Sequence, residues 1–192
     1  MIIRPDYIEA IKPFIDAPLV KILAGVRRCG KSTILAMMAE ELKKRGINGE
    51  NIIERRYNEM DMEEGFTAKD MYNDLKTAIQ GKGRCYLFLD ELQEVDGWEK
   101  VVNSLLEGCD VDIYVTGSNS KLMSSEISTY LTGRYVSIPV YTLSFKEYLT
   151  FKNKDFSEAR AIFDEYIRYG GFPLIGISDF DTRSAYQIVD GI

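Results

Sequence analysis

A glycine-bounded loop near the amino terminus constrains this chain more than any other feature of the sequence. The loop reads GVRRCGKS over residues 25–32, with Thr33 directly after it, and it matches the spacing GxxxxGK[ST]. The apolar run at residues 19–24 predicts a buried parallel strand before the loop, and the periodicity of residues 31–44 predicts a helix after it. Strand, loop and helix in this order are the context that the motif requires, so we expect parallel strands that alternate with helices.

The loop predicts a site for ATP with Mg²⁺. Two glycines let the backbone curl so that its amides point at phosphate oxygens, and the amino terminus of the following helix adds positive potential. Lys31 is expected to reach the β and γ phosphates, Ser32 to supply an oxygen to Mg²⁺, and Thr33 to face the α phosphate. The residues predicted to bind the nucleotide are Gly25, Val26, Arg27, Arg28, Cys29, Gly30, Lys31, Ser32 and Thr33.

Cys29 has two interpretations. In the first, its amide serves the loop and its side chain only fills space. In the second, Lys31 and the helix amino terminus lower the pKa of its thiol, and oxidation of that thiol blocks phosphate entry.

A second motif carries two adjacent carboxylates. Residues 86–91 read YLFLDE, four apolar residues followed by Asp90 and Glu91, which is the pattern of a Walker B strand. Asp90, at the end of the strand, is expected to hold Mg²⁺ through its water shell. Glu91 is expected to orient and deprotonate the attacking water. The order Asp-Glu favours a motor or switch ATPase over a small-molecule kinase.

The remaining elements follow from periodicity and turn signals. The sequence predicts further strands at residues 52–57, 85–89, 111–115 and 135–139, and helices at 4–14, 67–79, 98–106, 144–151, 157–169 and 181–189.

With these motifs assembled, the chain resembles the prokaryotic AAA+-type P-loop ATPases that are related to the archaeal ATPase and STAND groups. The matching segments are GVRRCGKST at 25–33, LFLDE at 87–91, VTGS at 115–118, LTGR at 131–134, PVYTLSFKEY at 139–148 and GGFP at 170–173.

The resemblance implies a three-layer α/β fold. Its parallel sheet has five strands in the order 5-1-4-3-2, and a small helical extension follows. We expect an ATPase core at residues 1–142 and a helical lid at 143–192. In this family a winged-helix region and a nuclease-like region come next, so we expect the chain to be a fragment of a longer protein.

The resemblance also suggests two auxiliary catalytic positions. AAA+ proteins place a polar sensor after the strand predicted at 111–115, and either Ser118 or Asn119 would serve. Arg134 is the candidate for an arginine that neutralises charge on the γ phosphate, within one chain or across a subunit interface. Its alternative is a surface salt bridge.

Composition limits the classes of partner. A net charge of −6 and a pI near 4.9 give no broad basic face for nucleic acid or membranes. No apolar run has the roughly 18 residues of a membrane span, and no signal peptide is evident, so we expect a cytoplasmic protein. The chain has no histidine, and its three cysteines lack CxxC spacing, which argues against imidazole chemistry, disulfides and zinc.

ATP hydrolysis is therefore the leading predicted function, with ATP and ADP as ligands. The alternative is a nucleotide-dependent switch with negligible turnover that signals by docking a partner domain. A GTPase ranks lower, because Asn153-Lys154-Asp155 has the wrong spacing for a guanine motif. The sequence leaves open self-association or a protein partner, and it allows nucleic acid only through the absent carboxyl-terminal region.

Overall fold

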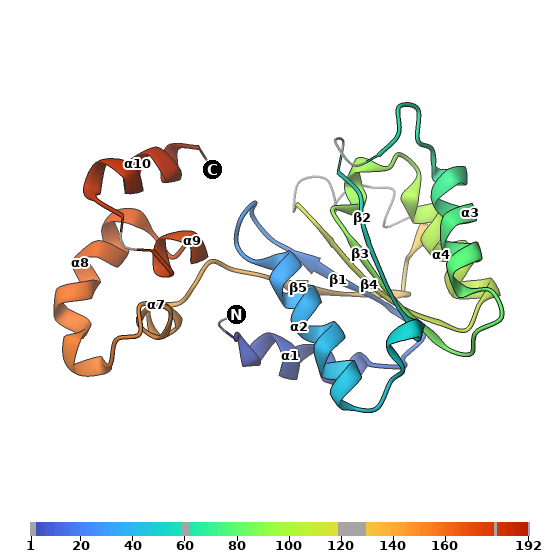
Figure 1. The fold of residues 1–192 in the computed structure, drawn as a ribbon, viewed down its shortest axis with the longest axis horizontal. Coiled ribbons are helices and arrows are strands. Elements are labelled where there is room, and N and C mark those ends of the chain that lie inside the picture. The colour runs from blue at the N-terminus through green and yellow to red at the C-terminus, as the bar shows by residue number, and fades with distance from the viewer. Residues whose placement is uncertain (1–2, 59–61, 119–129, 179, 192) are drawn as a thin grey trace.

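The computed structural model describes every residue except 1–2, 59–61, 119–129, 179 and 192 (Figure 1). The strands are β1 Val20–Ala24, β2 Ile52–Arg56, β3 Cys85–Asp90, β4 Val111–Gly117 and β5 Tyr135–Pro139. The α-helices are α1 Pro5–Ile11, α2 Lys31–Lys44, α3 Ala68–Ile79, α4 Trp98–Gly108, α7 Phe145–Phe151, α8 Ala159–Tyr169, α9 Pro173–Gly176 and α10 Thr182–Asp190. Short 3-10 turns lie at η1 Lys12–Phe14, η2 Gly49–Asn51, η3 Leu92–Glu94 and η4 Phe156–Glu158.

The strands form one parallel, five-stranded sheet in the order β2-β3-β4-β1-β5. Counted from the β5 edge, this is the predicted order 5-1-4-3-2, which confirms the expected fold class. Parallel neighbours need long crossover connections, and helices supply most of them here. The carboxyl ends of β1, β3 and β4 consequently meet at one edge of the sheet.

Alternating side chains of the strands face two different layers of helices. In β3, for example, Leu87 and Leu89 pack with α3 and α4, whereas Tyr86 and Phe88 pack with α1 and α2. Figure 1 shows α1 and α2 on one side of the sheet and α3 and α4 on the other. The three layers follow from strands whose residues are buried on both faces.

A charged pair interrupts these apolar strands. Lys21 of β1 and Asp112 of β4 are both fully buried and form an ion pair. Asp112 also accepts hydrogen bonds from the Tyr114 hydroxyl at 2.8 Å and from the Asp16 amide at 3.0 Å. The sequence predicts strands for both segments but gives no sign that their charged residues meet. The structure shows that neighbouring strands bring the two charges together, which makes their burial tolerable.

The residues after β5 form a group of helices with a core of their own. Leu143, Tyr148, Tyr169, Ile175 and Ala185 make up its buried cluster. Figure 1 shows α7 to α10 beside the sheet, joined to β5 by an extended segment. Helix α9 was not predicted, because a single turn that starts at proline carries no periodic signal.

Gly171 fixes how this helical group closes on the extended segment. A Cβ atom at this position would lie 2.1 Å from the Leu143 carbonyl oxygen. The Leu143 amide donates to the Gly171 carbonyl at 2.6 Å, so the two backbones are in direct contact. Only glycine permits this approach.

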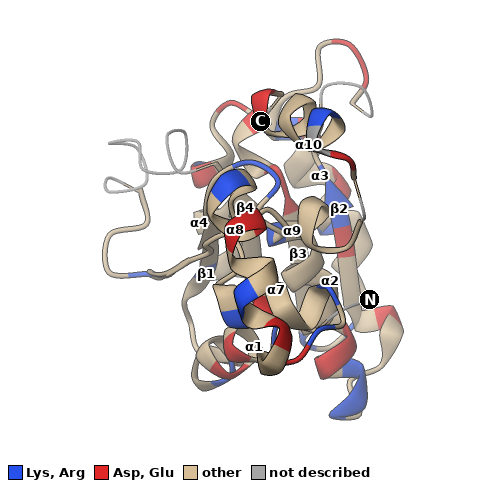
Figure 2. Cartoon of the chain, turned by 90° about the vertical axis from the view of Figure 1, so that its left-hand side faces the viewer, with Lys and Arg blue, Asp and Glu red and all other residues tan. Residues whose placement is uncertain are grey.

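The surface carries charges of both signs. Figure 2 shows Lys, Arg, Asp and Glu interspersed over the face formed by α7, α8 and α10. Within the described part of the chain, no helix has both the length and the apolarity that a membrane crossing demands.

Candidate active site

The loop between β1 and α2 owes its shape to two glycines with different roles. A Cβ atom on Gly25 would lie 2.2 Å from the Val140 carbonyl oxygen, so the chain that leaves β5 excludes any side chain there. Gly30 precedes α2 with φ of 103°, a conformation that favours glycine. Gly25 therefore lets the start of the loop lie against the backbone that follows β5, and Gly30 lets the chain turn from the loop into α2.

Lys31 folds back over the loop that precedes it. Its side chain is buried, and the ammonium group donates to the carbonyl oxygens of Gly25 and Val26, each at 3.1 Å. The positive charge is thus held against the first two residues of the loop. This is the place where the sequence predicts the β and γ phosphates.

Ser32 and Asp90 join the two predicted motifs. The Ser32 hydroxyl donates to Asp90 Oδ1 at 3.0 Å, although the residues are 58 positions apart. Asp90 ends β3 and is 9% exposed. A hydroxyl and a carboxylate oxygen are hard ligands of the kind that Mg²⁺ takes from proteins, together with phosphate oxygens and water. The two side chains therefore fit the predicted metal.

Glu91 has a constrained backbone and an oriented side chain. It adopts the left-handed conformation, with φ of 55°, which is uncommon for any residue other than glycine. Gln93 donates to Glu91 Oε2 at 2.6 Å and holds the carboxylate next to the end of β3. Strained conformations of this kind cluster at functional sites.

Thr116 is a residue of the site that the sequence analysis missed. It is fully buried in β4, and its hydroxyl donates to Asp90 Oδ1 and accepts from the Glu91 amide at 3.0 Å. A signal existed, because Leu89 and Val115 pair in register and the next residues of both strands must then be neighbours. That register could be inferred only once the strand order was assumed.

The two sensor candidates differ in what the structure says of them. Ser118 directly follows β4 at the same sheet edge and is partly buried. Asn119 lies outside the described residues. Both stay predictions.

Arg134 lies at the opposite end of the sheet. Its carbonyl oxygen accepts from the Val20 amide at 2.8 Å, at the start of β1, whereas the loop follows the end of β1. At about 3.3 Å per residue the strand separates the two by roughly 13 Å. The guanidinium pairs with Glu107 and lowers the pKa of that carboxyl. A role in the same chain's site is incompatible with this position, and a role across a subunit interface stays a prediction.

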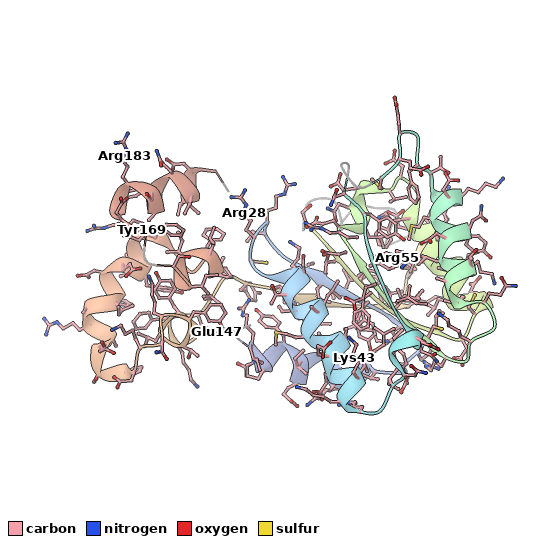
Figure 3. The ribbon with its side chains drawn as sticks, viewed as in Figure 1. Arg28, Lys43, Arg55, Glu147, Tyr169 and Arg183 are labelled. Atoms are coloured by element: carbon pink, nitrogen blue, oxygen red, sulfur yellow. The ribbon has the colours of Figure 1, made fainter. Side chains whose placement is uncertain are left out.

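Other arginines lie closer to the carboxylates. The register of β2 and β3 pairs Arg56 with Asp90, and Arg56 Nε lies 3.9 Å from Asp90 Oδ2. The side chains of Arg27 and Arg28 are exposed. Figure 3 shows Arg28 at the tip of the loop, extending away from the sheet.

The side chain of Cys29, within the loop, is buried. It is fully inaccessible, and its sulfur would lie 2.9 Å from a Cβ atom on Gly25. Burial raises the pKa of the Cys29 thiol, and the opposing effect of Lys31 is smaller. The pKa of the Cys29 thiol is therefore raised and not lowered, so the interpretation of Cys29 as a reactive thiol is wrong. The interpretation of its side chain as a space-filling group fits the structure.

We expect one fast-reacting thiol in the native protein. Cys109 is partly exposed, whereas Cys29 and Cys85 are buried. Burial also raises the pKa of the Cys85 thiol. Labelling with a chromogenic disulfide should rapidly release one equivalent of chromophore from the native chain. After denaturation in guanidinium it should release three equivalents, one for each cysteine. Rapid labelling of Cys29, located by mass spectrometry, would contradict this result.

The fold and the site together define a class of protein. A parallel sheet in this order, with a phosphate-binding loop after its first strand and an acidic pair after a central strand, is that of an AAA+ P-loop ATPase module. The sequence profile described as "AAA domain" matches residues 17–149. The chain belongs to this family.

Two curated relatives match over most or all of the chain. A Haemophilus influenzae protein described as uncharacterized is 38% identical over 196 residues, which cover 100% of this chain and 48% of the relative. An uncharacterized Methanocaldococcus jannaschii protein is 36% identical over 186 residues, covering 90% of this chain and 40% of the relative. The chain thus spans about half, or less, of the length of each of these curated relatives.

A similar solved structure is AMPPCP-bound DnaA from Aquifex aeolicus. It superposes with a TM-score of 0.59 and 16% sequence identity, over 92% of this chain and 61% of that one. At this identity the likeness concerns the fold.

Proposed function

We propose that this module binds ATP with Mg²⁺ and hydrolyses it. The observation that carries the proposal is the hydrogen bond of 3.0 Å between Ser32 and Asp90, with Glu91 next in the chain. This bond joins the hydroxyl and the carboxylate that we propose as metal ligands, and the residue that we propose as general base follows at the same sheet edge. The likeness to DnaA, whose structure holds AMPPCP, supports a nucleotide ligand for this module.

Each residue has a separate task in this proposal. The loop amides and the Lys31 ammonium bind the phosphates and offset their charge. Ser32 and Asp90 hold Mg²⁺, which neutralises charge that develops on the phosphoryl oxygens. Glu91 takes the proton of the attacking water. Thr116 positions the Asp90 carboxylate and the Glu91 backbone, because its hydroxyl contacts the Asp90 side chain and the Glu91 amide.

A slow nucleotide switch is the second candidate, and the contact between Gln93 and Glu91 favours it. Gln93 donates to Glu91 Oε2 at 2.6 Å, so a neighbouring side chain engages this oxygen and an attacking water could reach it only after that bond breaks. Arg134 is also remote from the site in its own chain. Turnover would then wait for a partner that frees Glu91 or supplies a cation.

The rest of the proposal concerns organisation. We assign residues 1–142 to the ATPase core and 143–192 to a helical lid, in keeping with the separate hydrophobic cluster there. The module acts in the cytoplasm on a second copy or a protein partner. We propose no nucleic-acid ligand for this module, because the face formed by α7, α8 and α10 carries charges of both signs (Figure 2).

The test compares phosphate release from ATP and GTP, with and without Mg²⁺, for the wild type and Asp90→Asn. We expect Mg²⁺-dependent release from ATP, lowered about 10²-fold in the variant because a metal ligand is lost. Asp74→Asn is the matched control, since Asp74 lies on α3 and pairs with Arg55 of β2 rather than with the loop. ATP binding without release would favour the switch, and absence of ATP binding would reject both candidates.

A further inference from the structure

Arg4 makes an unusual set of contacts for a residue before the first helix. It is 3% exposed, and its guanidinium donates to Glu147 Oε1 at 2.7 Å and Oε2 at 3.2 Å. The same group donates to the carbonyl oxygens of Cys29 at 3.1 Å, Tyr141 at 3.0 Å and Thr142 at 3.3 Å. Nearly all of its donor capacity is therefore used between segments that are distant in sequence.

One of these contacts reaches the phosphate-binding loop. Cys29 lies between Arg28 and Gly30, two residues with positive φ of 62° and 103°. Its carbonyl orientation fixes how the neighbouring peptide planes are turned, and thus where the loop amides point. A charged donor on that carbonyl holds the loop in the shape that binds phosphate.

The other contacts reach the helical group. Glu147 completes the capping box of α7, because its carboxylate also accepts from the Ser144 amide at 2.8 Å. Tyr141 and Thr142 belong to the extended segment between β5 and α7. Figure 3 shows Glu147 on the side of the helical group that faces the sheet. Pro173, at the start of α9, also approaches the loop, since a Cβ atom on Gly30 would lie 3.8 Å from its ring.

We propose that Arg4 is a positioning residue that couples the phosphate-binding loop to the helical group through Glu147. The inference rests on the proposed function, because the coupled ligand is the ATP bound at the loop. Filling the loop with phosphates stiffens the Cys29 peptide, and the guanidinium transmits this order to the amino terminus of α7. Conversely, a partner that binds α7 changes the affinity for nucleotide by the same factor by which the nucleotide changes the affinity for that partner.

Helix α1 has an anchor that does not depend on the guanidinium. Ile8 and Ile11 are buried in the core between α1 and α2. Arg4→Met keeps an unbranched side chain while it removes the donors, and Arg4→Lys keeps the charge without the fork geometry. Glu147→Gln provides a second variant that touches no loop atom. Lys12→Met is the matched control, because Lys12 pairs with Glu9 and Glu41 and not with the loop.

The experiment measures Mg²⁺-ATP affinity by calorimetry and amide hydrogen exchange in α7 with and without Mg²⁺-ATP, after circular dichroism shows that each variant is folded. We expect Arg4→Met and Glu147→Gln each to weaken binding about tenfold or more, Arg4→Lys to recover part of the loss, and Lys12→Met to match the wild type. The double variant Arg4→Met/Glu147→Gln should be no weaker than Arg4→Met alone. ATP should slow exchange in α7 of the wild type and not of Arg4→Met.

The outcomes separate this inference from the proposed function. A wild type that binds no ATP rejects the proposed function and the coupling with it. A wild type that binds ATP, with Arg4→Met binding equally well, overturns the coupling alone. Additive losses in the double variant, or α7 exchange that ATP leaves unchanged, also overturn it, since either result makes the two contacts independent.

Discussion

Replacing Glu91 with glutamine should lower Mg²⁺-dependent phosphate release by about 10²- to 10⁴-fold and leave ATP affinity nearly unchanged. Glutamine has the volume of glutamate, and its carbonyl oxygen can still accept the hydrogen bond from Gln93. It cannot take a proton from water at neutral pH. The loss therefore falls on the chemical step, while the loop, Lys31 and the proposed metal-binding pair Ser32 and Asp90 stay intact. Single-turnover phosphate release, with affinity measured separately, checks both parts.

Glu94 supplies the matched control for this substitution. Gln93 donates to Glu94 Oε1 at 3.1 Å as well as to Glu91, so Glu94→Gln changes a neighbouring carboxylate of the same small network. Its rate of phosphate release should stay within about threefold of the wild type, because the residue does not adjoin Asp90. Wild-type turnover by Glu91→Gln would mean that another group is the base. Loss of ATP binding would mean that Glu91 is needed for the fold of the site.

The parts of the site that the sequence predicted are those defined by local spacing. The loop at 25–33 specifies its own turn, because its glycines are required at fixed offsets and the following helix begins at Lys31. Asp90 was expected to end its strand, and it does. The strand order came from the family resemblance, and the structure confirms it.

The parts that the sequence did not reveal depend on partners far along the chain. Thr116 meets Asp90 only because β3 and β4 are neighbours in register. Arg4 precedes the first helix, and nothing in its own segment indicates that Cys29 and Glu147 surround it. Arg134 shows the reverse case: its motif suggested catalysis, while the topology places it at the other end of the sheet.

Lys21 and Asp112 illustrate the same limit in the core and lead to the second large effect. Lys21→Met should lower the free energy of unfolding by about 3–5 kcal/mol, because it leaves the Asp112 carboxylate buried without its cation. The Tyr114 hydroxyl and the Asp16 amide still donate to Asp112, but neither carries a charge. Urea unfolding followed by circular dichroism measures the change.

A double variant distinguishes the charge from the packing. In Lys21→Met/Asp112→Asn neither charge is buried, so the loss should be smaller than in Lys21→Met alone. Lys43→Met is the surface control, because Lys43 pairs with Glu40 where 42% and 54% of the two side chains are exposed to solvent. This substitution should change the free energy of unfolding by no more than about 1 kcal/mol. If Lys21→Met and the double variant are equally destabilised, the cost comes from lost packing. A smaller cost in the double variant means that the strands tolerate these two residues only as a pair, which explains how a lysine and an aspartate lie within a sheet core that is mainly apolar.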